Sequence, residues 1–529
     1  MKERLVDDWL TRINERGYQT AFGQVLAAQG FSILRIGHSA YEHGKDVLAI
    51  APNGEVHCYQ LKDGDIDIAK FERDFGQISG LVQARPSHPS LPADYVYRPF
   101  LVTNGLFTDP ALDRILHHNL GWEKLGFSRL QIHDGRWLHQ HFTDLSSDFW
   151  PTSPPDVREF RRLYLVDGRG DFEPETFARF VGSLLKGDLS RRDLERHAAA
   201  VNVFVSYILG EFYRQNDHWS IFRAWTMTAA SIACAYERSG TTSDTTKASF
   251  TLARDAADEA LGALATECRD ENTFKPTSLE WDECTRVRNA VTVGAWAAWC
   301  LLHPEDRESA RACISMLGRF TRDRRLGFWG ESCLPFVCAV SWLAEREGKI
   351  VEAKTLLLGW LQAIVSLQQR QSTNPLPDVY TSAEDALRRV AESLLDNEPK
   401  RPVAIASYSL LPLVLLSVNR GYKSELETHW KAISRITITV FKPDDKAGYL
   451  EWYCANGSET DQSFNQPQLW KELVEMASSP PVDKLPDVLR LDSQFRLMFI
   501  LAFPHRQVWS ILGSLDATFR SAAKSFEPD

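Results

Sequence analysis

The chain has 529 residues, 44% hydrophobic and 25% charged, with a formal net charge of −10. This length exceeds what one hydrophobic core usually serves and predicts two or three domains, while the composition excludes an intrinsically disordered chain. The negative charge disfavours a simple nucleic-acid binder, so any contact with DNA has to come from a local patch.

The sequence carries no pattern typical of secretion or membrane insertion. It begins without a basic segment followed by an apolar one, and its most apolar run, residues 408–418, is too short to span a bilayer. Its nine cysteines include no Cys-x-x-Cys pair, which favours buried reduced thiols over a zinc site. We therefore expect a cytoplasmic protein that makes no membrane contact.

Helical and strand-like periods alternate over about the first 150 residues. A Pro52-Asn53-Gly54 turn between two β-rich segments predicts a hairpin, and Thr108-Asp109-Pro110 is typical of a helix start. We expect a small α/β unit with this order: helix 21–31, strand 31–36, hairpin strands 45–52 and 55–62, helix 66–84, strand 97–104, helix 110–120, strand 129–134 and helix 135–142.

A Pro- and Ser-rich stretch at residues 148–160 indicates the domain boundary. We expect an α/β domain at 1–148, a linker or connector at 149–190, and a large all-α domain at 191–529. The segment 341–361, with Gly348 in its turn, is typical of a tetratricopeptide helix pair, but its neighbours do not repeat at a fixed period. The sequence therefore predicts an irregular helical array.

The ends of the predicted hairpin carry polar residues. Asp46 opens the first strand, and Gln60 and Lys62 close the second. Because Gln60 and Lys62 are two residues apart, they project from one face of the sheet, while the Leu61 side chain points to the other. Carboxylate and carbonyl oxygens suit a hard divalent cation, and a lysine can orient or deprotonate water and offset negative charge on a phosphorane.

These residues resemble the PD-(D/E)XK nuclease superfamily. The pattern Gly44-Lys45-Asp46, a β-hairpin and Gln60-Leu61-Lys62 is similar to its Mrr-type restriction endonuclease branch, where glutamine commonly replaces the acidic residue before x-Lys. The context agrees, since "QGFSILRI" precedes the hairpin and "FLVTNGLFTDPALDRI" follows it. The resemblance covers about residues 15–142, a quarter of the chain.

The resemblance implies a restriction-endonuclease-like fold and cleavage of DNA that depends on Mg²⁺, with Mn²⁺ as a substitute. Asp46 would be the principal metal ligand, Gln60 a second, neutral ligand or a group that orients a ligand, and Lys62 the catalytic lysine. The backbone carbonyl of Leu61 would complete the ligands.

One departure from the family concerns its first helix. The family usually places a glutamate there, where this chain has Gln19 or Thr20. Asp46 would then be the lone carboxylate ligand, and metal binding would be weak without substrate phosphate or a nearby acid. The candidates by sequence proximity are Glu15, Glu42, Asp63 and Asp65.

The resemblance favours a DNA endonuclease whose helical domain senses, binds a partner or oligomerises. By analogy, such a fusion suggests bacterial restriction or anti-phage defence, in which a second defence protein would be a partner. Cutting both strands would require a homodimer or larger assembly, because one site cuts one strand. The main alternative is a degenerate nuclease fold that acts as a scaffold through protein contacts. Cleavage of RNA is a third option.

Overall fold

In this computed structural model the following residues are described: 2–36, 45–92, 94–147, 154–164, 172–187, 189–240, 243–275, 282–323, 325–327, 329–369, 378–383, 385–386, 388, 406–453 and 458–524. Glu42 and Gly44, and residues 148–153 of the expected boundary, lie outside this part of the chain. The chain divides into two compact units, Met1–Ala260 and Leu261–Asp529.

A five-stranded sheet forms the N-terminal part of the first unit, in the order β1-β2-β3-β4-β5. The first three strands are antiparallel, and β3, β4 and β5 are parallel. The mixed α/β character predicted for this region is therefore confirmed. The strands are β1 (Ser32–Ile36), β2 (Val47–Ile50), β3 (Val56–Lys62), β4 (Tyr97–Thr103) and β5 (Gln131–His133).

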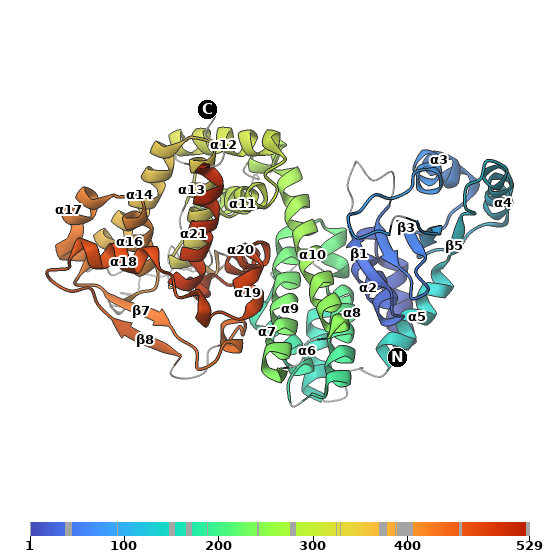
Figure 1. Cartoon of the computed structure of the whole chain (residues 1–529), viewed down its shortest axis with the longest axis horizontal. Helices are drawn as coiled ribbons and strands as arrows, with labels where there is room; N and C mark the ends of the chain where they lie inside the picture. The colour runs from blue at the N-terminus through green and yellow to red at the C-terminus, as the bar shows by residue number, and fades with distance from the viewer. Residues whose placement is uncertain are drawn as a thin grey trace. The chain divides into compact units, whose positions relative to one another are not determined.

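Helices cover both faces of this sheet (Figure 1). On one face, Phe22 packs edge-on against Tyr59, with ring centroids 5.1 Å apart, and lies 6.0 Å from Trp137. On the other, the side chains of alternate strand residues such as Val56 and Cys58 join a core with two helices. The helices are α1 (Lys2–Arg12), α2 (Glu15–Ala28), α3 (Ile68–Gln83), α4 (Asp109–Lys124) and α5 (Gly135–Ser147), with α2 and α5 on the first face and α3 and α4 on the second.

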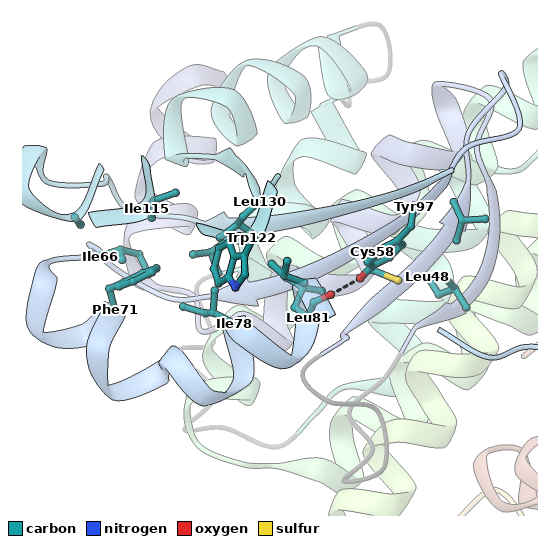
Figure 2. Packing of buried hydrophobic residues seen from close by; sticks show 14 residues of the cluster. Leu48, Cys58, Ile66, Phe71, Ile78, Leu81, Tyr97, Ile115, Trp122 and Leu130 are labelled. Atoms are coloured by element: carbon teal, nitrogen blue, oxygen red, sulfur yellow. Dashed lines mark hydrogen bonds between the residues drawn. The ribbon is translucent and has the colours of Figure 1, made fainter. Parts of the chain in front are cut away.

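The core beneath α3 and α4 is shown in Figure 2, where Trp122 lies near Ile78, Ile115 and Leu130. The Tyr97 hydroxyl donates a hydrogen bond to the Leu81 carbonyl oxygen at 2.5 Å, which fastens β4 to the end of α3. Burial of these apolar side chains fixes the position of α3 relative to β3.

The first unit continues beyond the expected boundary near residue 148. Asn202 donates from Nδ2 to Gln24 Oε1 at 2.9 Å, and Trp9 Nε1 donates to the Ser206 carbonyl at 3.1 Å. These bonds join the sheet's helices to the following ones, so whether 1–148 forms a domain of its own stays a prediction. The following helices are α6 (Pro154–Tyr164), α7 (Pro174–Leu184), α8 (Arg191–Arg214), α9 (His218–Ser239) and α10 (Asp244–Glu267).

The second unit is largely helical, as expected. Its α-helices are α11 (Asp282–Leu302), α12 (Arg307–Arg322), α13 (Leu334–Arg346), α14 (Ile350–Gln369), α16 (Leu410–Asn419), α17 (Lys423–Ile433), α18 (Trp470–Ser478), α19 (Asp487–Leu491), α20 (Ser493–Ala502) and α21 (Trp509–Lys524). Short 3₁₀ turns are η1 (Glu271–Phe274), η2 (Glu331–Cys333), η3 (Ala447–Tyr449), η4 (Val482–Lys484) and η5 (Pro504–Arg506).

The all-α prediction for this region is wrong in one respect. A three-stranded sheet is present, made of β6 (Ala406–Ser407), β7 (Thr437–Phe441) and β8 (Glu459–Gln462). The sequence Thr-Ile-Thr-Val-Phe of β7 is rich in β-branched and aromatic side chains, which favour a strand.

The predicted turn at Gly348 joins α13 to α14. Its φ of +74° lies in the left-handed region that glycine adopts without a steric cost. Among the helices described, none combines the length and apolarity needed to cross a membrane.

Candidate active site

The pairing of β2 with β3 brings Asp46 beside Gln60. Val47 lies opposite Tyr59, and the Asp46 N–H donates to the Tyr59 carbonyl oxygen at 2.9 Å. The turn that joins these strands is closed by two hydrogen bonds between Ala51 and residues 54 and 55, both of 2.8 Å. Gly54 has φ = +85°, so its conformation suits glycine. The convergence expected from the sequence is therefore a consequence of this register.

The carboxylate of Asp46 is buried, with 6% of the residue exposed. Its Oδ2 accepts a hydrogen bond from the Leu61 N–H at 2.6 Å. The main chain of Leu61 thus lies against this carboxylate, but the contact is made by the amide and not by the carbonyl. The expected role of the Leu61 carbonyl as a metal ligand stays a prediction.

Gln60 and Lys62 meet at one atom. The Gln60 Nε2 and the Lys62 Nζ each donate to the Oε1 of Gln77 on α3, and both distances are 2.9 Å. The Lys62 ammonium also lies 3.8 Å from Asp74 Oδ2, and its side chain is only 12% exposed. Both side chains therefore project towards α3, as their spacing of two predicts.

The other end of the Gln60 amide has no hydrogen-bond partner in the part of the chain that the structure describes. Its Oε1 is buried and accepts no hydrogen bond from the described residues, and Gln60 as a whole is 1% exposed. A buried amide oxygen without a donor costs free energy, roughly 1–3 kcal/mol. Such an atom is suited to a cation or to another donor.

Tyr18 of α2 supports Lys62 from the opposite face of the sheet. Its hydroxyl donates to the Lys62 carbonyl oxygen at 2.7 Å and accepts from the Lys62 N–H at 3.2 Å. Burial raises the pKa of Tyr18 well above its usual range, and the negative charges of Glu15, Asp46 and Asp63 raise it further. The hydroxyl therefore stays protonated and available as a donor.

The Thr-Asn pair that ends β4 shapes the loop after Lys62. Thr103 Oγ1 donates to the Gly64 carbonyl oxygen at 2.5 Å, and Asn104 Oδ1 accepts from the Gly64 N–H at 2.6 Å. Asn104 Nδ2 also donates to the carbonyl oxygens of Leu10 and Ile13, at 2.7 and 2.8 Å. Asn104 thus links the loop to the junction of α1 and α2.

The three described carboxylates suggested by sequence proximity, Glu15, Asp63 and Asp65, have contacts of their own. Asp65 Oδ1 accepts from the Leu106 N–H at 2.7 Å, and Asp63 forms an ion pair with Lys70 at 3.6 Å. Glu15 is in the first turn of α2 and affects the Tyr18 hydroxyl electrostatically.

Gln19 contacts another element. It is 1% exposed, and its Nε2 donates to Glu259 Oε2 of α10 at 3.3 Å. This contact directs its amide nitrogen towards α10. Its contribution to the site stays a prediction.

Three histidines of α4 and α5, His118, His139 and His141, have packing or hydrogen-bond contacts consistent with structural roles. The His118 ring lies 4.4 Å from Phe75, and His141 stacks on Trp137 with a centroid separation of 3.8 Å. His139 Nε2 lies 3.2 Å from the Glu3 carbonyl oxygen. In the part of the chain that the structure describes, no group of three or more His, Cys, Asp or Glu side chains is arranged to hold a metal.

Sequence reasoning did not identify Tyr18, Asp74 or Gln77. Asp74 and Gln77 are three residues apart on α3 and therefore share a helix face, and Asp74 borders the apolar face of Phe71 and Ile78. This polar pair was the available signal, but nothing in the sequence showed that the face lies over Lys62.

Comparisons with protein-family models, with curated proteins and with solved structures found no match for this chain.

Proposed function

We propose that this protein is a metal-dependent DNA endonuclease with Asp46, Gln60 and Lys62 in its active site. The proposal assigns β1–β5 and α2–α5 to a restriction-endonuclease-like domain of the PD-(D/E)XK type, in its Mrr branch. The observation that supports it best is the gathering of a buried carboxylate, an unpartnered amide oxygen and a lysine ammonium at one end of the β2–β3 hairpin.

The donor set is compatible with magnesium, a hard cation that prefers oxygen ligands. The unpartnered Oε1 of Gln60 is the observation that carries this fit, and the carboxylate of Asp46 supplies the charge. When bound, Mg²⁺ supplies Lewis-acid polarisation of a phosphodiester oxygen and activation of water. With one carboxylate, we expect weak metal binding until a substrate phosphate adds its own oxygen.

Lys62 would act on the phosphodiester by charge. Its ammonium is held by Gln77 Oε1 at 2.9 Å and lies near Asp74, so its position is fixed before substrate arrives. A fixed cation stabilises the negative charge that develops on phosphoryl oxygens more than a freely rotating one does. The Tyr18 hydroxyl fixes the main chain of the same residue.

The assembly and setting belong to the same proposal. Because one such site cleaves one strand, cleavage of a duplex would take a homo-oligomer. The helical region would provide the interface, or bind a partner protein of an anti-phage defence system in the cytoplasm. These assignments follow from the proposed activity.

One observation favours a second candidate, a catalytically inactive scaffold with a nuclease-like fold. Asp46 Oδ2 already accepts from the Leu61 N–H, and Gln60 and Gln19 are uncharged where acidic ligands would bind a metal more tightly. In that case the domain would act through protein contacts.

Nicking of supercoiled plasmid DNA with Mg²⁺ or Mn²⁺ separates the two. We expect nicking by the wild type, none by Asp46→Ala, and loss on the order of 10²–10³-fold for Lys62→Met. Lys124→Ala is the control, because Lys124 is an exposed lysine of α4. Nicking by both Asp46→Ala and Lys62→Met would overturn the assignment of the active site. Absence of nicking by the wild type as well as by the variants would favour the inactive scaffold. Cleavage of an RNA strand but not of DNA would identify a ribonuclease.

A further inference from the structure

We propose that Gln77 is a positioning residue that sets which atom of Gln60 faces the metal site. This role rests on the proposed function, because it concerns the same ligand set. It goes beyond that function in assigning a role to a side chain on α3, outside the hairpin that carries Asp46, Gln60 and Lys62.

The argument begins with the two ends of the Gln60 amide. A primary amide has a donor nitrogen and an acceptor oxygen, and only the oxygen can ligate a cation. Gln77 Oε1 can only accept, so the Gln60 end that faces it at 2.9 Å must be the nitrogen. The Gln60 oxygen is consequently the amide atom that does not bond to Gln77, and it is this oxygen that is buried without a partner among the described residues.

The Lys62 ammonium reinforces this orientation. It donates to the same Gln77 Oε1 at 2.9 Å, so a reversed Gln77 amide would place an NH₂ group against a cation. The NH₂ group of a reversed Gln77 would also face the NH₂ group of Gln60, unless the Gln60 amide reversed as well. One lysine thus fixes the Gln77 amide, and the Gln77 amide fixes that of Gln60.

The helix that carries Gln77 is well anchored. Its neighbour Ile78 is in the hydrophobic core, and the N-terminus of α3 is capped by Asp67, whose side chain accepts from the Lys70 N–H at 2.8 Å. Gln77 itself is exposed, so its replacement removes the polar contacts without leaving a cavity in the core. The polar contacts can therefore be tested without unfolding the protein.

Binding of Mn²⁺ to the full-length protein, followed by electron paramagnetic resonance in a titration to millimolar metal without DNA, tests this role. We expect Gln77→Leu to weaken Mn²⁺ binding by about 10-fold or more, as is typical when the partner of a metal ligand is removed. Gln77→Glu should restore binding to within about threefold of the wild type, because a carboxylate accepts from both Gln60 and Lys62. Gln83→Leu is the matched control, because Gln83 is exposed on the same helix and its side chain donates to Ser79 Oγ of that helix at 2.9 Å.

The outcomes separate this role from the proposed function. Binding that is lost in Asp46→Asn but unchanged in Gln77→Leu would overturn the role of Gln77 and leave the site in place. Equal loss in the Leu and Glu variants would also overturn it, since the acceptor oxygen would then be irrelevant. A wild type that binds no Mn²⁺ at millimolar metal would overturn the metal site and the role of Gln77 together.

Discussion

The Tyr18 hydroxyl and the main chain of Lys62 are joined by two hydrogen bonds, one donated to the Lys62 carbonyl and one accepted from its N–H. A side chain of α2 thereby adds to the pairing of β3 with β4, where Lys62 lies opposite Thr103 and its carbonyl oxygen also accepts from the Asn104 N–H at 3.4 Å. The lysine that we assign to catalysis is thus positioned by a helix on the opposite face of the sheet.

Tyr18→Phe should therefore remove two hydrogen bonds from the main chain of Lys62, whose carbonyl oxygen keeps only the longer bond from the Asn104 N–H, at 3.4 Å, among the described residues. We expect the free energy of unfolding to fall by about 1–3 kcal/mol, and plasmid nicking to fall with it. Chemical denaturation and the nicking assay measure both. Tyr95→Phe is the control, because it removes a single hydrogen bond, to the Pro86 carbonyl oxygen. Equal effects of the two substitutions would show that the bond to Lys62 has no special importance.

Asp46→Asn separates charge from hydrogen bonding at the metal site. Asparagine keeps an oxygen that can accept from the Leu61 N–H, so we expect the melting temperature to change little. Metal-dependent nicking should be lost, because the carboxylate charge is removed. A large fall in melting temperature would indicate that Asp46 serves mainly the fold.

Asn104→Ala should loosen the loop that follows Lys62. It removes hydrogen bonds to Gly64, Leu10 and Ile13, and we expect a loss of about 2–4 kcal/mol in the free energy of unfolding. Asn53→Ala, which removes an exposed bond from the Glu55 N–H and an exposed side-chain contact with the Glu55 carboxylate, should cost less than about 1 kcal/mol. If Asn104→Ala costs no more than Asn53→Ala, the link between the loop and α1–α2 is not important for stability.

Glu331 in the second unit predicts a pH dependence of stability. Burial raises its pKa from 4.5 to about 7, although it accepts hydrogen bonds from Ser407 Oγ and the Tyr408 N–H. A carboxyl group whose pKa is raised on folding holds its proton more tightly in the folded state. Its contribution to stability is therefore complete below pH 4.5 and is lost as the pH rises through 7.

Glu331→Gln should remove this dependence. The unfolding free energy of the variant should rise relative to the wild type between pH 5 and pH 7.5, by roughly 3 kcal/mol at most. Urea denaturation at a series of pH values measures the difference. A difference that stays constant with pH would show that Glu331 has the same pKa in the folded and unfolded states.

The sequence predicted the elements whose signals are local. The Pro-Asn-Gly turn and the alternation around it predicted the pairing of Asp46 with Gln60, and helical spacing predicted α3 within two residues at each end. The strand β7 differs from the predicted helical array. The β-branched residues of Thr437–Phe441 favour a strand, but the helical pattern of the surrounding sequence outweighed this short signal in the prediction.

The rest of the site depends on contacts between residues far apart in the chain. Tyr18 reaches Lys62 across 44 positions, and Gln19 reaches Glu259 across 240. Nothing in the spacing of either residue indicates its partner, because such contacts are set by how α2 packs between other elements. Gln77 is nearer to Lys62 in sequence, but its contact with Lys62 depends on how α3 packs against β3.

Helix α2 is buried along nearly its whole length, from Gly17 to Ala27. Tyr18 and Phe22 of this helix contact β3. Gln24 contacts α8, and Gln19 contacts α10. A fragment cut at residue 148 would expose the polar and apolar side chains that α8 and α10 cover. Attempts to express the sheet alone should therefore give aggregated protein, and the shortest useful fragment has to extend through α10.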